Sequence, residues 1–421
     1  MPSIADERTH RFGWFVMALV FLASVVNYLD RAILGVLMPE IRRDLALTNS
    51  DYALTVNAFL IIYTAAYIIG GRVADRLGSR TTFSITLLWW SFAAMSHAFV
   101  QGVATLALCR AFLGVGEGGY YPTAICAAAE WFQPAHRARA VGLILSSISI
   151  GTLLTPPIVA VVTLHYGWRA AFLLTGGAGL LLIPAWLFLH RQIHRHFGVK
   201  DPQPGASAID AHQAASAPLT AALRSRRYWC LLSSRACADA AWYFYLFWMP
   251  GYFQEQRHLN LAQAGQLLWI PFATAGIGAL FGAWAGTALI LRGWPIGRSR
   301  SFMLITSALA ATAGALACLV PQYQLALAIV SAALFGHTSF SSNIHTAITE
   351  ASPAQHVAVL YGMTGAAGTL GGVLMQFAVG RMVDTSGYNA AFLLASILYA
   401  TSIAAVLASK LHRDAGLQAG G

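Results

Sequence analysis

The stretch from Leu106 to Phe132 combines apolar character with two ionisable side chains near its middle, Arg110 and Glu117. Its length and composition predict a helix that crosses a bilayer. Seven residues are two helical turns, so both side chains are expected on one face. A charge in hydrocarbon costs about 2.5–3.5 kcal/mol on insertion scales. The two groups are therefore either a structural ion pair that locks helices together or an anion site with a titratable neighbour. We interpret them as the second, because ionisable groups inside membranes usually mark function.

The first predicted span places two more ionisable groups in an apolar stretch, Asp30 and Arg31, with Tyr28 beside them. Adjacent residues cannot share one helix face, so one side chain is expected to face a cavity and the other a neighbouring helix. Asp30 then either neutralises an arginine, as a structural group, or carries a proton while Arg31 binds an anion. In the second predicted span Tyr63 and Tyr67 lie one turn apart. Such pairs commonly pack, but here we expect them to face the same cavity as Tyr28.

The second part of the chain offers groups suited to hydroxyls rather than to charge. Arg235 and Asp239 lie one turn apart and are expected to form a helix-stabilising salt bridge. Trp242 and Tyr243 follow, and such rings can stack on a sugar and hydrogen-bond its hydroxyl groups. The tenth predicted span carries uncharged polar side chains that also suit hydroxyl recognition, among them His337, Ser341 and Asn343.

Membrane helices must position these groups, because the chain of 421 residues is 57% hydrophobic and only 10% charged, with a mean hydropathy of +0.61. Soluble domains carry more charge, so we predict an integral membrane protein. The formal net charge of +10 could suggest a nucleic-acid partner, but its placement follows membrane topology, and we expect no nucleic acid. The five cysteines stand singly without metal-ligand spacing, so neither a metal nor a cofactor is expected. The first apolar stretch is too long for a cleavable signal peptide.

Hydropathy predicts twelve spans, and an even number places both termini on one side of the membrane. The spans are expected near 13–37, 51–71, 80–101, 104–132, 138–164, 169–190, 228–253, 263–291, 301–320, 324–349, 356–383 and 388–409. Basic residues concentrate in the termini and in the loops on their side. The opposite loops carry only Arg42, Arg43, Arg169, Arg257 and Arg381. The positive-inside rule therefore predicts cytoplasmic termini.

The chain reads as two similar six-span halves, 1–190 and 228–421, joined by a polar cytoplasmic linker over 191–227. The segment GWRAAFLL at 167–174 matches GYNAAFLL at 387–394. Further pairs share the same offset: Glu130 with Glu350, Gly142 with Gly362, and Glu117 with His337. Such a duplication is typical of transporters whose site lies where the repeats meet.

The loop after the second span reads GGRVADRLGSR and reproduces the signature G-x-x-x-D-R-x-G-x-R of the major facilitator superfamily, from Gly71 to Arg80. Glycines permit a tight turn between closely linked helices. Asp75 and Arg76 are predicted to contribute to a breakable cytoplasmic ion-pair latch, and therefore to gating. The second half lacks a carboxylate at the corresponding place, so any latch is expected to be asymmetric.

The segments YLDR, NAFLIIY, RAFLGVGEGG and HYGWRAAF resemble the anion:cation symporter family of this superfamily, and WYFYLFWMPGYF and GHTSFSSN are similar to bacterial hexuronate transporters. The resemblance covers the chain except the termini and the linker. It implies that Arg31 and Arg110 bind the substrate carboxylate and that Asp30 and Glu117 carry protons. The sequence departs from such transporters at three plausible cavity positions: Tyr120, Leu145 and Ser149.

We therefore expect an all-α membrane protein with twelve transmembrane helices in two pseudo-symmetric six-helix halves, the major facilitator fold. The predicted function is proton-coupled import of a sugar acid, a hexuronate or aldonate, by alternating access. A transporter of another small organic or inorganic anion, or an exchanger or exporter of the same fold, is the alternative. A membrane enzyme is disfavoured because no catalytic motif is present. The protein is expected to be monomeric and to lie in a bacterial inner membrane.

Overall fold

The computed structural model describes residues 4–132, 134–197, 223–352 and 356–413. Within these ranges the chain forms helices and short connections but no strand. It divides into two compact units, Met1–Gln213 and Ala214–Gly421, which we call unit 1 and unit 2. The predicted linker lies partly outside the described residues. The helix before the linker continues to Phe197, and the helix after it begins at Arg226. Both helices therefore extend into the range 191–227 that was predicted as linker.

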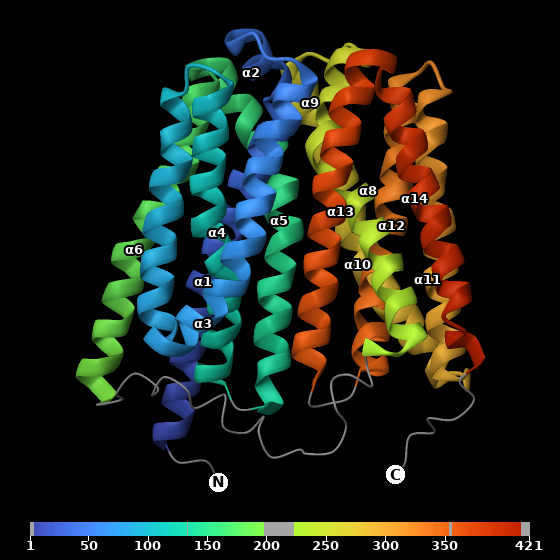
Figure 1. Cartoon of the computed structure of the whole chain (residues 1–421). Coiled ribbons are helices and arrows are strands. Elements are labelled where there is room, and N and C mark those ends of the chain that lie inside the picture. The colour runs from blue at the N-terminus through green and yellow to red at the C-terminus, as the bar shows by residue number, and fades with distance from the viewer. Residues whose placement is uncertain (1–3, 133, 198–222, 353–355, 414–421) are drawn as a thin grey trace. The chain divides into compact units, whose positions relative to one another are not determined.

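Unit 1 is a bundle of long helices (Figure 1). Its elements are α1 (Ile4–Val36), α2 (Met38–Leu45), α3 (Asn49–Ser96), the 3₁₀ turn His97–Phe99, α4 (Val103–Trp131), α5 (Pro134–Tyr166) and α6 (Trp168–Phe197). α1 begins and α6 ends at the same end of the unit, as an even number of crossings requires.

Unit 2 repeats this plan. Its elements are α8 (Arg226–Gly251), the π-helical turn Tyr252–Gln256, α9 (Leu261–Leu267), α10 (Trp269–Leu291), α11 (Ile296–Thr312), the 3₁₀ turn Ala313–Cys318, α12 (Tyr323–Ala351), α13 (Val357–Ser386), α14 (Tyr388–Ala408) and the 3₁₀ turn Leu411–Arg413. α8 begins and α14 ends at one end of this unit.

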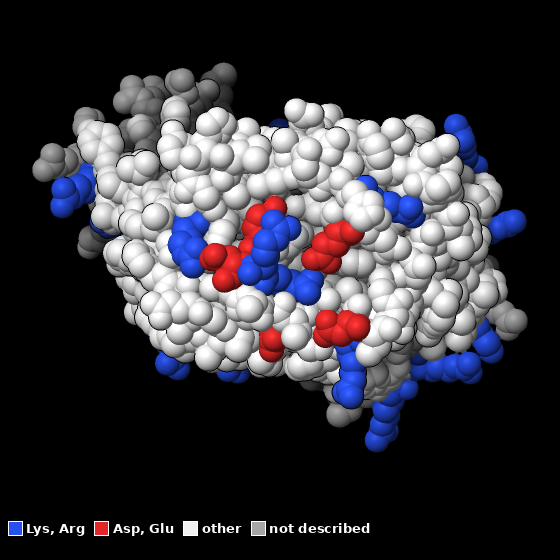
Figure 2. All heavy atoms as spheres, turned by 90° about the horizontal axis from the view of Figure 1, so that it is seen from above, with Lys and Arg blue, Asp and Glu red and all other residues white. Residues whose placement is uncertain are grey.

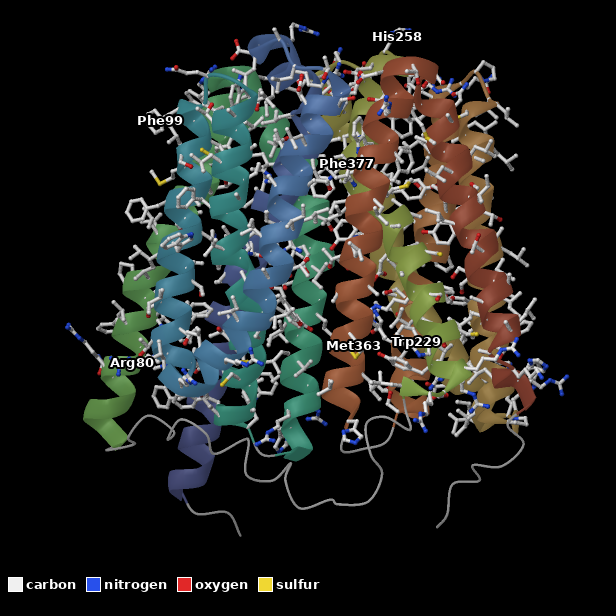
Figure 3. The ribbon with its side chains drawn as sticks, in the orientation of Figure 1. Arg80, Phe99, Trp229, His258, Met363 and Phe377 are labelled. Atoms are coloured by element: carbon white, nitrogen blue, oxygen red, sulfur yellow. The ribbon has the colours of Figure 1, made fainter. Side chains whose placement is uncertain are left out.

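The helix α3 supplies two of the crossings in unit 1. Its backbone is helical on both sides of Gly78, which alone has φ 75° and ψ 161°. This left-handed region is open to glycine and costly for other residues, so one glycine reverses the chain. Arg80 and Phe99, labelled in Figure 3, lie at opposite ends of unit 1 and mark the course of the second arm. The turn is tighter than the predicted loop from 71 to 80, because both helices continue almost to Gly78.

Nine described helices are long and apolar enough to cross a membrane by length and composition. The remaining three crossings are α4, α8 and the second arm of α3. Two of them, α4 and α8, carry buried charged side chains near their middles, Arg110 and Glu117 in the first and Arg235 in the second. The helix α1 also carries buried charges, Asp30 and Arg31, yet remains apolar enough to be among the nine.

The end of unit 1 that carries α2 is organised by polar contacts. Thr48 and Asp51 form a capping box that begins α3, each side chain accepting the other's backbone N–H at 3.0 Å. Asp44 accepts hydrogen bonds from Arg169 at 2.6 Å and from the indole of Trp168 at 3.2 Å, which ties α2 to α6. The Arg169 guanidinium lowers the pKa of the Asp44 carboxyl below its usual value. Figure 2 looks onto this end and shows acidic and basic side chains interspersed.

Candidate substrate and coupling site

An ion pair between α1 and α4 forms the centre of the candidate site in unit 1. Arg31 on α1 donates from Nη2 at 2.9 Å and from Nε at 3.1 Å to one oxygen of Glu117 on α4. Both side chains are nearly inaccessible, 7% and 0% exposed. Glu117 therefore pairs across helices with Arg31 rather than along α4 with Arg110. Seven residues correspond to a rise of about 10.5 Å, which is too far for direct pairing within one helix.

Arg110 is fully buried, and none of its guanidinium nitrogens has a hydrogen-bond partner among the described residues. Its Cζ lies over the ring of Phe59, 4.5 Å from the centroid. A cation–π contact contributes about 2 kcal/mol when desolvated. The cost of burying an unpaired charge is several kcal/mol. Arg110 is thus a buried cation whose five N–H donors have no acceptor within the described part of the chain.

Asp30 lies in the same charged cluster but faces other elements. Its side chain is 1% exposed, and neither carboxyl oxygen has a hydrogen-bond partner by distance and angle among the described residues. Its neighbours include Trp90 on the second arm of α3 and Thr175 on α6, with Glu117 and Arg110 within electrostatic range. Adjacent residues of α1 therefore point to different neighbours, as the sequence required. The cluster holds two arginines and two acids, and only one pair is joined directly.

Aromatic rings cover the arginines of this cluster. The Arg31 Cζ lies 4.8 Å from the ring centroid of Tyr28, 4.5 Å from that of Tyr63 and 5.4 Å from that of Phe59. Tyr67 is one step removed, because it packs on Tyr63 with centroids 6.1 Å apart. Sequence reasoning did not identify Phe59, the ring shared by Arg31 and Arg110. The sequence indicated Phe59 only by its position one helical turn before Tyr63. An apolar ring at that spacing usually packs in the protein core.

Close approach of α3 and α4 sets these rings against the charges. A Cβ at Gly118 would lie 2.7 Å from the carbonyl oxygen of Tyr63 and 2.7 Å from the Cβ of Ala66. Only glycine fits there without moving backbone. Small residues at such positions allow membrane helices to pack closely. Gly118 thereby positions Tyr63, and with it the aromatic cover of Arg31.

Tyr120 does not occupy the cavity position suggested by the sequence. It is 1% exposed, and its hydroxyl donates to the Val20 carbonyl oxygen. Its ring packs edge-on against Trp90, with centroids 5.2 Å apart. Tyr120 is therefore a core residue between α4, α1 and the second arm of α3. Of the other two positions, Leu145 is 45% exposed and Ser149 is half-buried.

In unit 2 the aromatic and polar residues of α8 and α12 form a second cluster. The rings of Trp242 and His337 stack at 4.9 Å, and a 2.8 Å hydrogen bond joins His337 Nδ1 to the Tyr399 hydroxyl. Tyr243 is half-buried and stacks on Phe247 at 6.2 Å. Trp242 is also half-buried, so these two rings keep an accessible part while His337 is enclosed.

Asn343 has a structural role that the sequence prediction did not assign to it. Its Nδ2 donates to the carbonyl oxygens of Gly282 at 2.9 Å and Ser339 at 3.0 Å, and its Oδ1 accepts from Arg300 at 3.3 Å. The side chain is 0% exposed. Because protein groups engage both ends of the amide, we withdraw Asn343 from the candidate substrate groups. Ser341, by contrast, is half-buried, and its hydroxyl makes no hydrogen bond within the described residues.

The predicted salt bridge on α8 is present and is part of a larger contact. Arg235 donates from Nε to Asp239 at 3.2 Å and from Nη1 to Thr364 on α13 at 2.6 Å. Its Cζ lies 4.9 Å from the ring centroid of Tyr361. Unlike Arg110, this guanidinium has its counter-charge in place. Unit 2 therefore offers no unpaired buried arginine among its described residues comparable to that of unit 1.

Comparison with known proteins identifies the family of this chain. Residues 20–336 match the family described as Major Facilitator Superfamily. The chain belongs to the major facilitator superfamily. It is 26% identical to a D-galactonate transporter of Escherichia coli O6:H1, covering 92% of this chain and 93% of that protein. It is 25% identical to a hexuronate transporter of Escherichia coli K12, covering 91% and 90%. The resemblance to hexuronate transporters is thereby confirmed.

The fold agrees with this assignment. The crystal structure of a bacterial homolog to the human lysosomal transporter Spinster, inward-facing and unoccupied, superposes with a TM-score of 0.68 at 18% identity, covering 95% of this chain and 96% of that one. The protein is an all-α, multi-pass membrane protein with twelve transmembrane helices in two six-helix halves, as predicted.

The major facilitator signature loop lies at the end of unit 1 opposite α2. Arg76 is exposed, and the side chain of Asp75 lies outside the described residues, so the predicted latch stays a prediction. At this end Ser79 donates its backbone N–H to Glu130 at 3.0 Å. In unit 2 the corresponding acid, Glu350, accepts from Arg300 at 2.9 Å. No cluster of three or more His, Cys, Asp or Glu side chains that could hold a metal is found in the described part of the chain.

Proposed function

We propose that this major facilitator protein is a proton-coupled symporter that imports a sugar acid, a hexuronate or aldonate, by opening to one side of the membrane at a time. The observation that carries the proposal is the buried, unpaired guanidinium of Arg110 next to the Arg31–Glu117 ion pair. Arg110 forms no direct ion pair with any described residue, and Arg31 can be released from Glu117 by a proton. Together they provide a site for a carboxylate whose affinity depends on pH.

Arg110 is the proposed first partner of the substrate carboxylate. A guanidinium presents two parallel N–H donors that match the two oxygens of a carboxylate, which lysine cannot do. The ring of Phe59 lies against the Arg110 guanidinium. Tyr28 and Tyr63 cover Arg31 in the same way and can donate hydroxyl hydrogen bonds to the substrate. Tyr67 is proposed to support this aromatic wall through Tyr63 rather than to contact the substrate.

Glu117 is the proposed principal proton carrier. While it is ionised it occupies Arg31, and an incoming carboxylate must compete with it for that charge. Protonation weakens the pair, so Arg31 can join Arg110 in binding the anion, and the proton travels with the substrate. After release, Glu117 ionises and again neutralises Arg31, which allows the empty carrier to return. Asp30 is a proposed second proton carrier, because its carboxyl group is buried near the same charges and makes no ion pair with a described residue.

Hydroxyl recognition is proposed for unit 2. Ser341 has an uncommitted hydroxyl among the described residues, and the half-buried rings of Trp242 and Tyr243 can stack on a sugar. His337 is proposed to orient Trp242 through their stacked rings. The galactonate and hexuronate carriers among the relatives support a polyhydroxy acid over a simple inorganic anion.

The proposed orientation places both termini in the cytoplasm of a bacterial cell, with the protein in the inner membrane as a monomer. The distribution of basic residues supports this orientation, because the loops on the side of the termini carry more arginines than the loops at the end of unit 1 that carries α2. In this orientation the Gly78 turn is cytoplasmic, where Asp75 and Arg76 are proposed to contribute to gating.

Uptake by purified protein in proteoliposomes tests the proposal. D-galactonate and D-glucuronate should accumulate under an inward proton gradient, and the neutral sugar D-galactose should not. Arg110→Gln should abolish uptake, whereas Arg381→Gln, which removes an exposed arginine near the end of α13, should not. Accumulation of sugar acid that is unaffected by collapsing the proton gradient would overturn symport. Full uptake by Arg110→Gln would overturn the site.

A further inference from the structure

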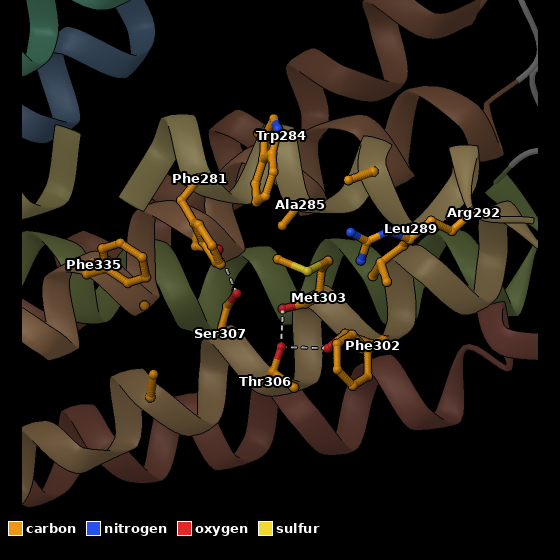
Figure 4. Close-up of a pocket in the computed structure, with 14 residues that line it drawn as sticks. Phe281, Trp284, Ala285, Leu289, Arg292, Phe302, Met303, Thr306, Ser307 and Phe335 are labelled. Atoms are coloured by element: carbon orange, nitrogen blue, oxygen red, sulfur yellow. Dashed lines mark hydrogen bonds between the residues drawn. The ribbon is translucent and has the colours of Figure 1, made fainter. Parts of the chain in front are cut away.

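A groove of about 340 Å³ opens between α10, α11 and α12 of unit 2 (Figure 4). Its walls are mainly aromatic, with Phe281 and Trp284 from α10, Phe302 from α11 and Phe335 from α12. Three of these rings are conspicuously accessible, since Trp284 is 65% exposed, Phe302 45% and Phe281 42%. In a protein that spans a membrane, such rings are available to hydrocarbon. The volume is at the lower end of the range for small-molecule sites.

The hydroxyl groups that line the groove are already engaged in hydrogen bonds. The Thr306 hydroxyl donates to the Phe302 carbonyl oxygen at 2.8 Å within α11. The hydroxyls of Ser307 and Ser339 hydrogen-bond each other at 2.8 Å across α11 and α12. A polyhydroxy acid placed here would lose hydrogen bonds to water without replacing them, at a cost for each hydroxyl. The chemistry of the lining therefore favours an alkyl chain and separates this groove from the proposed sugar-acid site.

Positive charge stands at one end of the groove. Arg292 lines it and is exposed. Arg298 follows near the start of α11, with its Cζ 4.9 Å from the ring centroid of Trp294, and Trp294 packs on the groove residue Phe302 at 5.4 Å. Two cationic side chains and an indole ring thus lie at this end of the apolar groove. Tryptophan and arginine are typical of the membrane interface, where indole and guanidinium meet lipid headgroups.

We propose that this groove binds one acyl chain of an anionic phospholipid, whose phosphate contacts Arg292 and Arg298. The charge complementarity selects an anionic headgroup, and the aromatic walls select the chain. On the predicted topology the connection from α10 to α11 is cytoplasmic, so the lipid belongs to the leaflet in which basic sites commonly recruit anionic headgroups. Lipid binding here does not depend on which anion the protein transports.

Thermal unfolding of the purified, delipidated full chain in detergent tests this site, because a ligand that binds the folded state raises the unfolding temperature. The probes are dioleoyl phosphatidylglycerol, dioleoyl phosphatidylcholine and glycerol 3-phosphate. We expect a saturable rise with phosphatidylglycerol at least about twofold larger than with phosphatidylcholine, and none with glycerol 3-phosphate. The double variant Arg292→Gln/Arg298→Gln should lower the phosphatidylglycerol effect to that of phosphatidylcholine. The exposed Arg381→Gln serves as the matched control and should retain the full difference.

A second variant, Ala285→Phe, fills the groove and should remove the response to phosphatidylglycerol while leaving both arginines. If that variant does not fold, the double arginine variant decides alone, because Arg292 and Arg298 are exposed. Equal responses to the two lipids in the wild type, or an undiminished response in the double variant, would overturn the proposal. A rise with glycerol 3-phosphate equal to that with phosphatidylglycerol would indicate a phosphate site without an acyl groove. Dimers that dissociate in Ala285→Phe would indicate a second copy of the chain as the occupant. Either of these two results would also reject the proposal.

Discussion

Replacing Glu117 by glutamine removes the charge that holds Arg31 while keeping a side chain of the same shape. In the wild type, one Glu117 oxygen accepts two N–H groups of Arg31 at 2.9 and 3.1 Å, with the carboxyl side fully buried. Removing one partner of a buried pair costs about 3–5 kcal/mol. Because an amide oxygen still accepts one hydrogen bond, we expect about 3 kcal/mol, at the lower end of that range. The variant should therefore unfold at a lower temperature but remain folded.

The same substitution removes the competitor of the substrate. At high pH, where the wild-type acid is ionised, Glu117→Gln should bind a sugar acid more tightly by up to about 3 kcal/mol, or roughly 100-fold. Its affinity should also become nearly independent of pH, whereas wild-type affinity should rise as pH falls, by up to about tenfold per pH unit for one linked proton. Binding is measured by calorimetry at pH 6 and pH 8. In proteoliposomes the variant should exchange labelled for unlabelled substrate but should not accumulate it under a proton gradient.

Glu350→Gln is the matched control, because Glu350 also accepts from an arginine at 2.9 Å but belongs to a partly exposed pair in unit 2. It should retain proton-driven accumulation. Full accumulation by Glu117→Gln would show that Glu117 is not the required carrier and would make Asp30 the candidate. A folded Glu117→Gln that binds no substrate would show that the Arg31–Glu117 pair is a structural lock. That outcome would refute the competition on which the coupling scheme rests.

Four further predictions concern other groups. Arg110→Lys should lower kcat/KM for a sugar acid by about 10–100-fold in uptake assays, since it loses a charge-assisted hydrogen bond of about 1.5–3 kcal/mol; near-wild-type uptake would exclude a bidentate role. Ser341→Ala should weaken binding of a hexuronate but not of a short carboxylate that is also bound. Asn343→Ala should instead lower the unfolding temperature, because it breaks the contacts of Asn343 with Gly282 and Arg300. Because the folded pKa of Asp44 is lowered, its contact with Arg169 should stabilise the protein above about pH 4 and lose this effect as pH falls further. Asp44→Asn should therefore lower the unfolding temperature slightly at pH 7 and by less at pH 3, and an equal effect at both would argue against the ion pair.

The fold could be predicted from the sequence because hydropathy and the repeat act over many residues at once. Even α4 and α8, whose charges reduce their apolarity, lie where hydropathy predicts spans, at 104–132 and 228–253. The boundaries were less accurate. The turn at Gly78 is shorter than its loop signature suggested, and α6 continues to Phe197. Charged and polar residues near a helix end fit equally well in a solvated last turn and in a loop, so composition alone does not separate them.

The candidate site was predictable in its members but less so in its pairings. Arg31, Arg110 and Glu117 stood out because each places a charge in an apolar helix. Which arginine meets the acid depends on the depth and rotation of α1 against α4, and neither follows from the periodicity of one helix. The same limit explains Tyr120 and Asn343, whose polar groups turned inward to backbone and side-chain partners. Phe59 was missed because a ring that covers guanidinium groups has the same sequence pattern as a ring that fills a core.

The unpaired charge of Arg110 has a consequence for neutral sugars, which cells often contain in large excess over sugar acids. A hexose matches a hexuronate in most of its hydroxyl groups but brings no counter-charge. If it occupied the site, Arg110 would stay as unpaired as it is without substrate, whereas a carboxylate would relieve a cost of about 3–5 kcal/mol, which corresponds to discrimination of at least about 100-fold. Discrimination of this kind comes from compensation of a charge that is already buried, which the acid provides and the neutral sugar does not. A carrier built in this way would not be inhibited by neutral sugars, even where they greatly outnumber its substrate.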